Sequence, residues 1–284
     1  MQMDEEQIRT ALTTRVFGRN LVFLPCTGST NDVAKDLAVQ GAPEGTVVVA
    51  DEQTAGRGRL GRHWSAPPGA CLLCSILFRS ILLPTQAMRL TMLCSLAAAD
   101  AIQQVAGLHV DLKWPNDLIV KLSQVCKSSP QYPTPNPQSP IPNTQYPTWK
   151  KLAGILTETG AAGERLEFAI VGIGINVNVP AEALPTLAPD ATSILAETGQ
   201  TTDRAALLAA LLAGVEQRHQ ALQAGGNPQP EWAARLATLG QPVQVTTPNG
   251  VLTGVAESVD EDGALLLRTP DGTLHRLLTG DVTL

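Results

Sequence analysis

The sequence has no uninterrupted apolar run of membrane length, although 44% of its 284 residues are hydrophobic. A bilayer-spanning helix needs about 20 mostly apolar residues, so we expect no transmembrane segment and no membrane partner. The N-terminus reads Met-Gln-Met-Asp-Glu-Glu and lacks the positive charge with which a secretory signal peptide begins. These absences predict a cytoplasmic protein, and the length allows one large domain plus a small one.

Cysteine is also scarce. The chain has five cysteines, mostly within apolar stretches, and no second Cys-x-x-Cys pair accompanies Cys71 and Cys74. An odd number in a chain expected in the reducing cytoplasm favours thiols in the core over a disulfide framework. Because a structural zinc site takes four ligands, we expect no dedicated metal ligands.

Two common nucleotide-binding fingerprints are missing. Gly172-Ile173-Gly174-Ile175-Asn176 lacks the third glycine of G-x-G-x-x-G, and the sequence contains no G-x-x-x-x-G-K-[ST]. A Rossmann dinucleotide site and a P-loop NTPase are therefore disfavoured. Glycine inside a strand often marks a close approach by a ligand or another backbone, and we expect such an approach here.

One loop concentrates positive charge in a chain whose formal net charge is -6: residues 56–64 hold three arginines and three glycines. A guanidinium presents paired N–H donors that match carboxylate or phosphate oxygens, and glycine lets the backbone approach a ligand closely. Strands expected at 46–50 and 71–78 anchor the loop at both ends. The pattern favours a specific anionic ligand, with a solvated basic loop as the alternative.

A second concentrated signal is Lys113-Trp114-Pro115-Asn116-Asp117. Proline restricts the preceding residue to extended backbone, so we expect the lysine to end a strand and to point to a defined place. An edge strand that closes in an Asn-Asp turn explains the same residues and stays open as an interpretation.

Apolar runs alternate with helical patterns over most of the chain. Strands are expected at 21–24, 46–50, 71–78, 110–113, 118–120, 152–157 and 166–178. Helices are expected at Asp4–Arg15, Val33–Val39, Pro84–Ala106 and 203–223. Strands interleaved with helices predict a mixed α/β sheet.

Two segments depart from this alternation. Residues 128–149 hold seven of the 21 prolines among Ser, Asn, Gln and Thr. That composition cannot form a packed core, so we expect a disordered surface insertion between two joined strands. After Gln241, short apolar strands are separated by hairpin-favouring Asn-Gly and Asp-Gly pairs, which predicts a small all-β barrel.

These segments resemble, in order, the motifs of biotin–protein ligases over about residues 21–180. The matching segments are Ser29-Thr30-Asn31, Asp51-Glu52-Gln53, the 56–64 loop, Lys113–Asp117, Lys151–Ile155 and Gly172–Asn176. The resemblance implies an α/β (α+β) fold, a mixed sheet flanked by helices like that of class II aminoacyl-tRNA synthetases. It divides the chain into a catalytic domain at 1–238 and an SH3-like β-barrel at 239–284.

The resemblance also implies a reaction. Family members activate biotin with ATP and Mg²⁺ to biotinyl-5′-AMP and pass biotin to a lysine of the biotin carboxyl carrier protein of acetyl-CoA carboxylase. The first step brings two anions together, which requires neutralised charge and fixed geometry, and Arg57, Arg59 and Lys113 can supply both. A homodimer that pairs through sheet edges is expected as well.

Residue roles follow from the same resemblance. Lys113 is expected to bridge the biotin carboxylate and the α-phosphate, and Arg59 to retain the adenylate, so both are candidate catalytic residues. Hydroxyls and amides suit the neutral urea of biotin, and the other biotin-binding candidates are Ser29, Thr30, Asn31, Gln53, Arg57 and Gly58. The ATP-binding candidates are Gly56, Arg62, Trp64, Asn116 and Asn176.

About twenty residues precede the first expected strand, too few for the winged-helix DNA-binding domain of many bacterial relatives. We therefore expect the short form of the family and no nucleic-acid partner. Two alternatives stay open: a lipoate–protein ligase or octanoyl transferase, which shares the catalytic architecture, and a non-catalytic biotin-binding module. The presence of Arg59 and Lys113 argues against the module.

Overall fold

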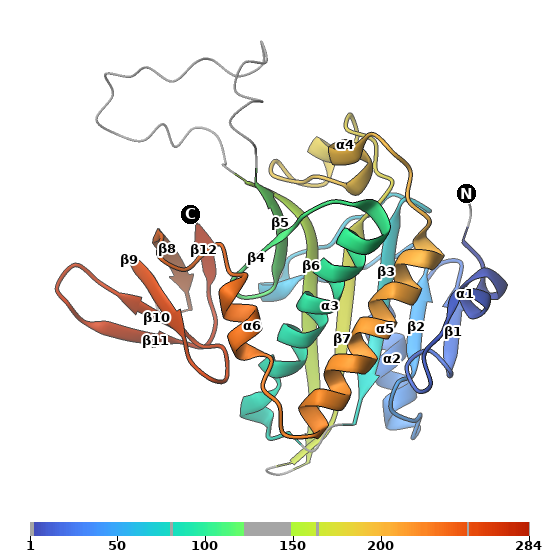
Figure 1. Ribbon diagram of the computed structural model, residues 1–284, viewed down its shortest axis with the longest axis horizontal. Helices are drawn as coiled ribbons and strands as arrows, with labels where there is room; N and C mark the ends of the chain where they lie inside the picture. Colours follow the sequence, from blue (N-terminus) through green and yellow to red (C-terminus); the bar gives the residue numbers. More distant parts are fainter. Residues whose placement is uncertain (1–2, 80–81, 122–148, 163–164, 249, 284) are drawn as a thin grey trace.

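Figure 1 shows the computed structural model, which describes residues 3–79, 82–121, 149–162, 165–248 and 250–283. The larger sheet has the strand order β1-β2-β3-β7-β6-β5-β4, and the smaller sheet has the order β11-β10-β9-β8-β12. In the larger sheet β1 and β2 are parallel, whereas the other neighbours are antiparallel. The predicted mixed sheet is confirmed.

The larger sheet consists of β1 Leu21–Leu24, β2 Val47–Ala50, β3 Cys71–Phe78, β4 Asp111–Lys113, β5 Asp117–Lys121, β6 Trp149–Ala162 and β7 Arg165–Asn176. The smaller, SH3-like sheet consists of β8 Pro242–Thr247, β9 Gly250–Val259, β10 Leu265–Arg268, β11 Leu274–Leu277 and β12 Asp281–Thr283. The helices are α1 Glu5–Ala11, α2 Thr30–Val39, α3 Met88–Ala106, α4 Ile194–Thr198, α5 Arg204–Gln223 and α6 Gln229–Ala234. Short 3₁₀ turns lie at η1 Arg59–Gly61, η2 Pro84–Gln86 and η4 Leu184–Thr186. Within the described ranges, no helix combines the length and apolarity needed to cross a membrane.

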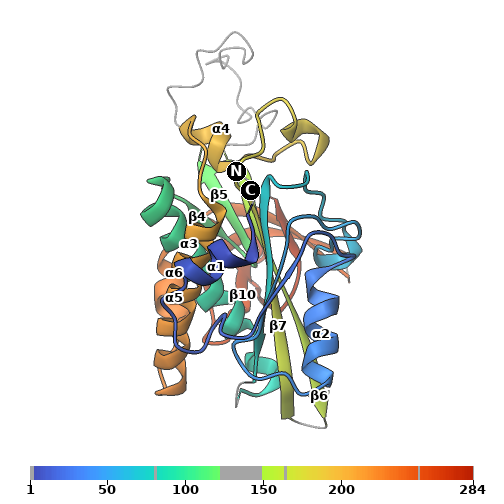
Figure 2. The same cartoon turned by 90° about the vertical axis from the view of Figure 1, so that its right-hand side faces the viewer.

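Helices cover both faces of the larger sheet. Figure 2 shows α3 and α5 on one face and α2 on the other. Successive side chains of a strand point to opposite faces, and β2 follows this rule: Val47 and Val49 join the core beneath α3 and α5, while Val48 joins the core beneath α2. A strand buried on both faces therefore reads as a continuous apolar run.

Helix ends follow local signals. Asp4 caps α1 with a capping box, and Gly107 ends α3 at a left-handed φ of 66°. The helix predicted to reach Arg15 is too long, since α1 stops at Ala11, and α2 begins at Thr30, earlier than predicted. The short helices α4 and α6 have no counterpart among the predicted elements, because five or six residues are too few to display helical periodicity.

The predicted insertion at 128–149 falls almost entirely outside the described residues. Trp149 is the exception and begins β6. The strands on either side, β5 and β6, pair as antiparallel neighbours. The prediction that the insertion joins two strands of one sheet is confirmed.

The C-terminal sheet is fastened to the larger sheet at the Lys-Trp-Pro motif. Trp114 is 1% exposed, and its Nε1 donates to the carbonyl of Gly263 at 2.9 Å. Gly263 has a φ of +86°, a left-handed conformation that favours glycine at this position of the predicted Asp-Gly turn. Arg89 on α3 pairs with Asp262 in the same turn at 2.9 Å. These contacts set the C-terminal sheet beside the end of β4.

Candidate active site

A cavity of about 450 Å³ brings the concentrated sequence motifs together. Its walls come from the start of α2, the 56–64 loop, strands β3 to β7, residues 187–191 and β12. Twelve of the thirteen predicted site residues line it: Ser29, Thr30, Asn31, Gln53, Arg57, Gly58, Arg59, Arg62, Trp64, Lys113, Asn116 and Asn176. The thirteenth, Gly56, is buried at the base of the loop beside them.

The 56–64 loop is a narrow hairpin. The Trp64 N–H donates to the Gly56 carbonyl at 2.9 Å, and the Gly58 N–H donates to the Arg62 carbonyl at 2.7 Å. A Cβ on Gly56 would lie 2.5 Å from the Trp64 carbonyl oxygen, so this crossing of two backbones requires glycine. At the tip, Leu60 adopts a left-handed φ of 56°. The loop therefore presents its arginines from a defined hairpin.

Two of the three loop arginines are paired with carboxylates. Nη2 of Arg57 lies 2.7 Å from Oδ1 of Asp32 and 3.0 Å from Oε2 of Glu158. Nη2 of Arg62 lies 2.9 Å from Oδ2 of Asp281 on β12. Residue composition alone indicates three equivalent cations, but these contacts offset the charge of two of them.

Arg59 differs because its direct partners are uncharged. Its guanidinium donates to Oδ1 of Asn116 at 3.1 Å and to Oγ1 of Thr279 at 2.8 Å. Burial lowers the pKa of Arg59, and the nearby carboxylates of Asp117 and Asp281 oppose that shift. An arginine still keeps its proton, so Arg59 offers the cavity a positive charge that an anion can use.

Two lysines add to this cationic side. Lys113 is buried, and its Nζ lies 4.0 Å from the centroid of the Trp149 ring; burial lowers its pKa, while Asp117 and Asp281 raise it. Lys151 at the start of β6 pairs with Oδ1 of Asp117 at 2.7 Å, and its Nζ lies 5.7 Å from the Trp64 ring centroid. Both lysines line the cavity.

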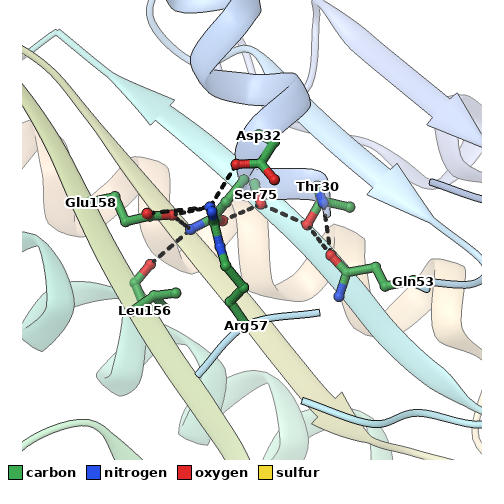
Figure 3. Close-up of polar contacts among 8 residues, drawn as sticks. Thr30, Asp32, Gln53, Arg57, Ser75, Leu156 and Glu158 are labelled. Carbon is green, nitrogen blue, oxygen red and sulfur yellow. Dashed lines mark hydrogen bonds and ion pairs between the residues drawn. The ribbon is translucent and has the colours of Figure 1, made fainter. Parts of the chain in front are cut away.

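Another side of the cavity is polar and, apart from the ion-paired Arg57, uncharged. Gln53 Oε1 accepts from both the N–H and the hydroxyl of Thr30, at 2.7 and 2.9 Å, as Figure 3 shows. Oγ of Ser75 lies 2.7 Å from the Thr30 hydroxyl oxygen, so a chain of buried groups orients the Gln53 amide. Ser29 occupies the predicted N-cap position, but within the described residues its side chain makes no capping hydrogen bond. Its hydroxyl is thus left to the cavity.

Glycines on β6 and β7 make room for side chains of the protein itself. A Cβ on Gly172 would lie 2.2 Å from Oδ1 of Asn31, and one on Gly174 would lie 2.7 Å from Cε2 of Trp64. Gly154 also faces the Trp64 ring, at 3.2 Å. The predicted close approach is present, but the approaching groups are side chains, not another backbone.

The two asparagines predicted to contact nucleotide are held by backbone carbonyls. Asn116 donates from Nδ2 to Ile155 at 2.6 Å, and Asn176 donates from Nδ2 to Thr192 at 2.9 Å. Both amides are therefore fixed in orientation before any ligand binds.

Three further candidates emerge from the structure. Lys151 belongs to the Lys151–Ile155 segment, whose resemblance to the family motif gives the lysine no predicted role. Thr279 and Asp281 contact the arginine loop from more than 200 residues away, and a single sequence carries no signal for such a contact. The C-terminal sheet thus contributes part of the cavity wall.

Two of the cysteines lie close to the site: Cys74 lines the cavity, and Sγ of Cys71 donates to Oδ1 of Asn176 at 3.6 Å. Cys71, Cys74 and Cys94 are buried, as predicted, whereas Cys26 is exposed. Cys126 lies outside the described residues. Burial raises the pKa of both Cys71 and Cys74 to about 12, so both thiols stay protonated near neutral pH. The described residues contain no group of three or more His, Cys, Asp or Glu side chains suited to a metal ion.

Comparison with known proteins shows the family to which this chain is similar. The Biotin/lipoate A/B protein ligase family matches residues 23–176, and the Biotin protein ligase C terminal domain matches residues 238–284. The bifunctional ligase/repressor BirA of Bacillus spizizenii is 32% identical over 286 residues, covering 100% of this chain and 79% of that protein. The biotin–[acetyl-CoA-carboxylase] ligase of Mycobacterium tuberculosis is 32% identical over 274 residues, covering 93% and 90%. The biotin protein ligase of Aquifex aeolicus, solved with biotin and ATP, aligns with a TM-score of 0.68 and 26% identity, covering 93% of this chain and 98% of that one.

Proposed function

Since this chain belongs to the Biotin/lipoate A/B protein ligase family, we propose that it is a biotin–protein ligase. In this proposal it activates biotin with ATP to biotinyl-5′-AMP and then transfers the biotinyl group to a lysine of an acceptor protein. The observation that carries the proposal is that one cavity joins a neutral polar side to a cationic side. Biotin has the same division, with a neutral urea at one end and a carboxylate at the other.

The neutral side is proposed to hold the urea. A urea offers two N–H donors and one carbonyl acceptor, which match the hydroxyls and amides of Ser29, Thr30 and Gln53. Because Thr30 and Gln53 are already hydrogen-bonded to each other, their orientation costs little entropy when biotin binds. Asn31, Arg57 and Gly58 complete this side.

The cationic side is proposed to catalyse adenylation. A carboxylate oxygen of biotin attacks the α-phosphorus of ATP, a new P–O bond forms, and pyrophosphate leaves. Arg59, Lys113 and Lys151 can neutralise the carboxylate and the α-phosphate and so lower the barrier electrostatically. In the second step the acceptor lysine nitrogen forms an amide with the acyl carbon, and AMP leaves.

The nucleotide is proposed to lie along Trp64, with Gly56, Arg62, Asn116 and Asn176 nearby. Nε1 of Trp64 is buried without a hydrogen-bond partner among the described residues, so it can donate to a bound ligand. Mg²⁺ is typically held by substrate phosphates together with one or two carboxylates. We propose that it enters with ATP, where it would neutralise phosphate charge.

The acceptor protein is proposed from the names of related proteins. The Mycobacterium tuberculosis relative is named for acetyl-CoA carboxylase, and we extend this to the biotin carboxyl carrier protein as the acceptor here.

The catalytic part is proposed to span 1–238 and the SH3-like part 239–284. Strands β1 and β4 end the larger sheet, but Leu112 of β4 is bridged to Leu236. The edge of β1 is therefore the one proposed to support a homodimer. A cytoplasmic location remains part of the proposal.

Pyrophosphate release distinguishes the candidate activities, because the family name covers both biotin and lipoate ligases. The enzyme is incubated with ATP, Mg²⁺ and biotin, lipoate or octanoate in separate reactions. We expect release with biotin at least about 100-fold faster than with the other two acids, since each lacks a urea to satisfy the polar side. Release with lipoate but not biotin would contradict the proposal, and biotin binding without release would support the non-catalytic module.

A further inference from the structure

Glu158 lies on β6 and is not among the residues proposed above for binding or catalysis. Figure 3 shows its carboxylate facing Arg57 of the loop, close to the start of α2. Oε2 of Glu158 accepts from Nδ2 of Asn31 at 2.6 Å and from Nη2 of Arg57 at 3.0 Å. One carboxylate therefore connects the sheet, a helix start and the arginine loop.

The contact with Asn31 fixes the carboxylate from the buried side. Asn31 is 3% exposed, and its Oδ1 accepts from Oγ of the fully buried Ser75 at 2.6 Å. A Cβ on Gly172 would lie 2.2 Å from this Oδ1, so glycine leaves the room that the amide occupies. Nδ2 of Asn31 also donates to the Leu156 carbonyl, but at 3.4 Å, so Glu158 is its closer acceptor. A buried amide that loses its partner is costly, which makes Glu158 a fixed anchor.

The contact with Arg57 fixes the loop from the exposed side. The same Nη2 atom reaches Oδ1 of Asp32 at 2.7 Å, so two carboxylates flank one guanidinium. Their combined charge outweighs that of Arg57. Arg59, two residues on, has uncharged Asn116 and Thr279 as its direct partners instead.

We propose that Glu158, together with Asp32, is a positioning residue that clamps Arg57 and so fixes the start of the 56–64 loop over the neutral side of the cavity. The two carboxylates more than offset the positive charge of Arg57, so this side does not attract an anion and leaves anions to Arg59. Arg57 then serves as an anchor for the loop and not as an anion ligand. The identity of the group bound on this side as the urea of biotin rests on the proposed function, but the clamp itself does not.

Hydrogen exchange of the ligand-free protein tests the clamp without requiring activity. In a Glu158→Gln/Asp32→Asn variant, glutamine still offers Asn31 an oxygen acceptor, while the attraction to Arg57 is removed. We expect the hydrogen-bonded amides of Gly58 and Trp64 to exchange about fivefold faster than in the wild type, the factor that follows from losing an ion pair at the strong end of the exposed range. The Ala256 amide, bonded to the Gln241 carbonyl in the C-terminal sheet, should not change.

Glu257→Gln is the matched control. Glu257 pairs with Arg268 on the C-terminal sheet, and side-chain exposures of 38% and 44% resemble the 36% and 41% of Glu158 and Arg57. Exchange in the loop should remain at the wild-type rate in this variant. Wild-type exchange in the double variant would overturn the clamp.

A kinetic readout separates positioning from a general loss of structure. The double variant should raise the KM for biotin about fivefold with little change in kcat, because the loop is less often closed over the neutral side while Arg59 is untouched. A fall in kcat with an unchanged KM would contradict the clamp. If the wild type releases no pyrophosphate, the proposed function fails, and the exchange experiment still decides the clamp.

Discussion

The Lys113→Ala variant is expected to form biotinyl-5′-AMP about 100-fold more slowly than the wild type, the usual cost of removing one preorganised electrostatic group. The Lys151→Ala variant is expected to be slowed less, because Lys151 is already paired with Asp117. Both ammonium groups line the cavity on its cationic side. Adenylation brings a carboxylate against a phosphate, and each lost charge leaves part of their repulsion uncompensated. Rapid-quench measurement of the adenylate formed from biotin and ATP gives the rate directly.

Two further variants test whether the lower rate comes from a loss of folding stability or from the removal of any lysine. Lys113 is buried, so Lys113→Met retains an apolar stem of similar length and should lose activity while keeping the wild-type melting temperature. Lys121→Ala removes an exposed lysine of β5 that pairs with Asp111 at 3.2 Å and should keep the wild-type rate. Wild-type adenylation in both Lys113→Met and Lys151→Ala would contradict the proposed chemistry of the cationic side.

The Arg59→Gly variant is expected to release biotinyl-5′-AMP at least about tenfold faster, because a hydrogen bond to a charged group contributes about 1.5–3 kcal/mol. The adenylate then reacts in solution, so the variant should label lysines on unrelated proteins. Gel filtration of the enzyme with bound adenylate, followed by timed analysis of the free fraction, measures the release rate.

Arg62→Gly is the informative comparison for this prediction. It makes the same change in the same loop, but Arg62 is already paired with Asp281, so we expect a smaller increase in release. Arg268→Gly on the C-terminal sheet should leave release unchanged. Equal retention of the adenylate by Arg59→Gly and the wild type would remove Arg59 from the proposed role.

The sheet was largely predictable because its strands are short apolar runs with polar ends. β1 and β3 occupy the predicted residues, and both buried faces of β2 follow from its unbroken apolar run. The start of α3 was less predictable: Pro84 begins the 3₁₀ turn η2, and the α-helix starts at Met88. Proline fixes its own φ and suits either kind of helical turn, so the sequence alone cannot separate them.

The parts of the site that lie within short sequence motifs were predictable. The arginine loop and the Lys-Trp-Pro segment each concentrate unusual residues within a few positions, and the structure brings them to one cavity. Whether each loop arginine is paired with a carboxylate was not predictable, because the partners lie far apart in the sequence. Arg57 pairs with Glu158 from 101 positions away, and Arg62 pairs with Asp281 from 219 positions away. Tertiary contacts decide which cation is already neutralised and which remains for a ligand.

The most direct test of the central claim is the intact mass of a biotin carboxyl carrier domain incubated with this enzyme, biotin, ATP and Mg²⁺. We expect a mass increase of one biotinyl group on a single lysine, and no increase when ATP is omitted, because the carboxylate must first be joined to the α-phosphate. An unmodified carrier domain under conditions that biotinylate it with a known ligase would contradict the account, as would a mass increase of one lipoyl group, but none with biotin, when both acids are supplied.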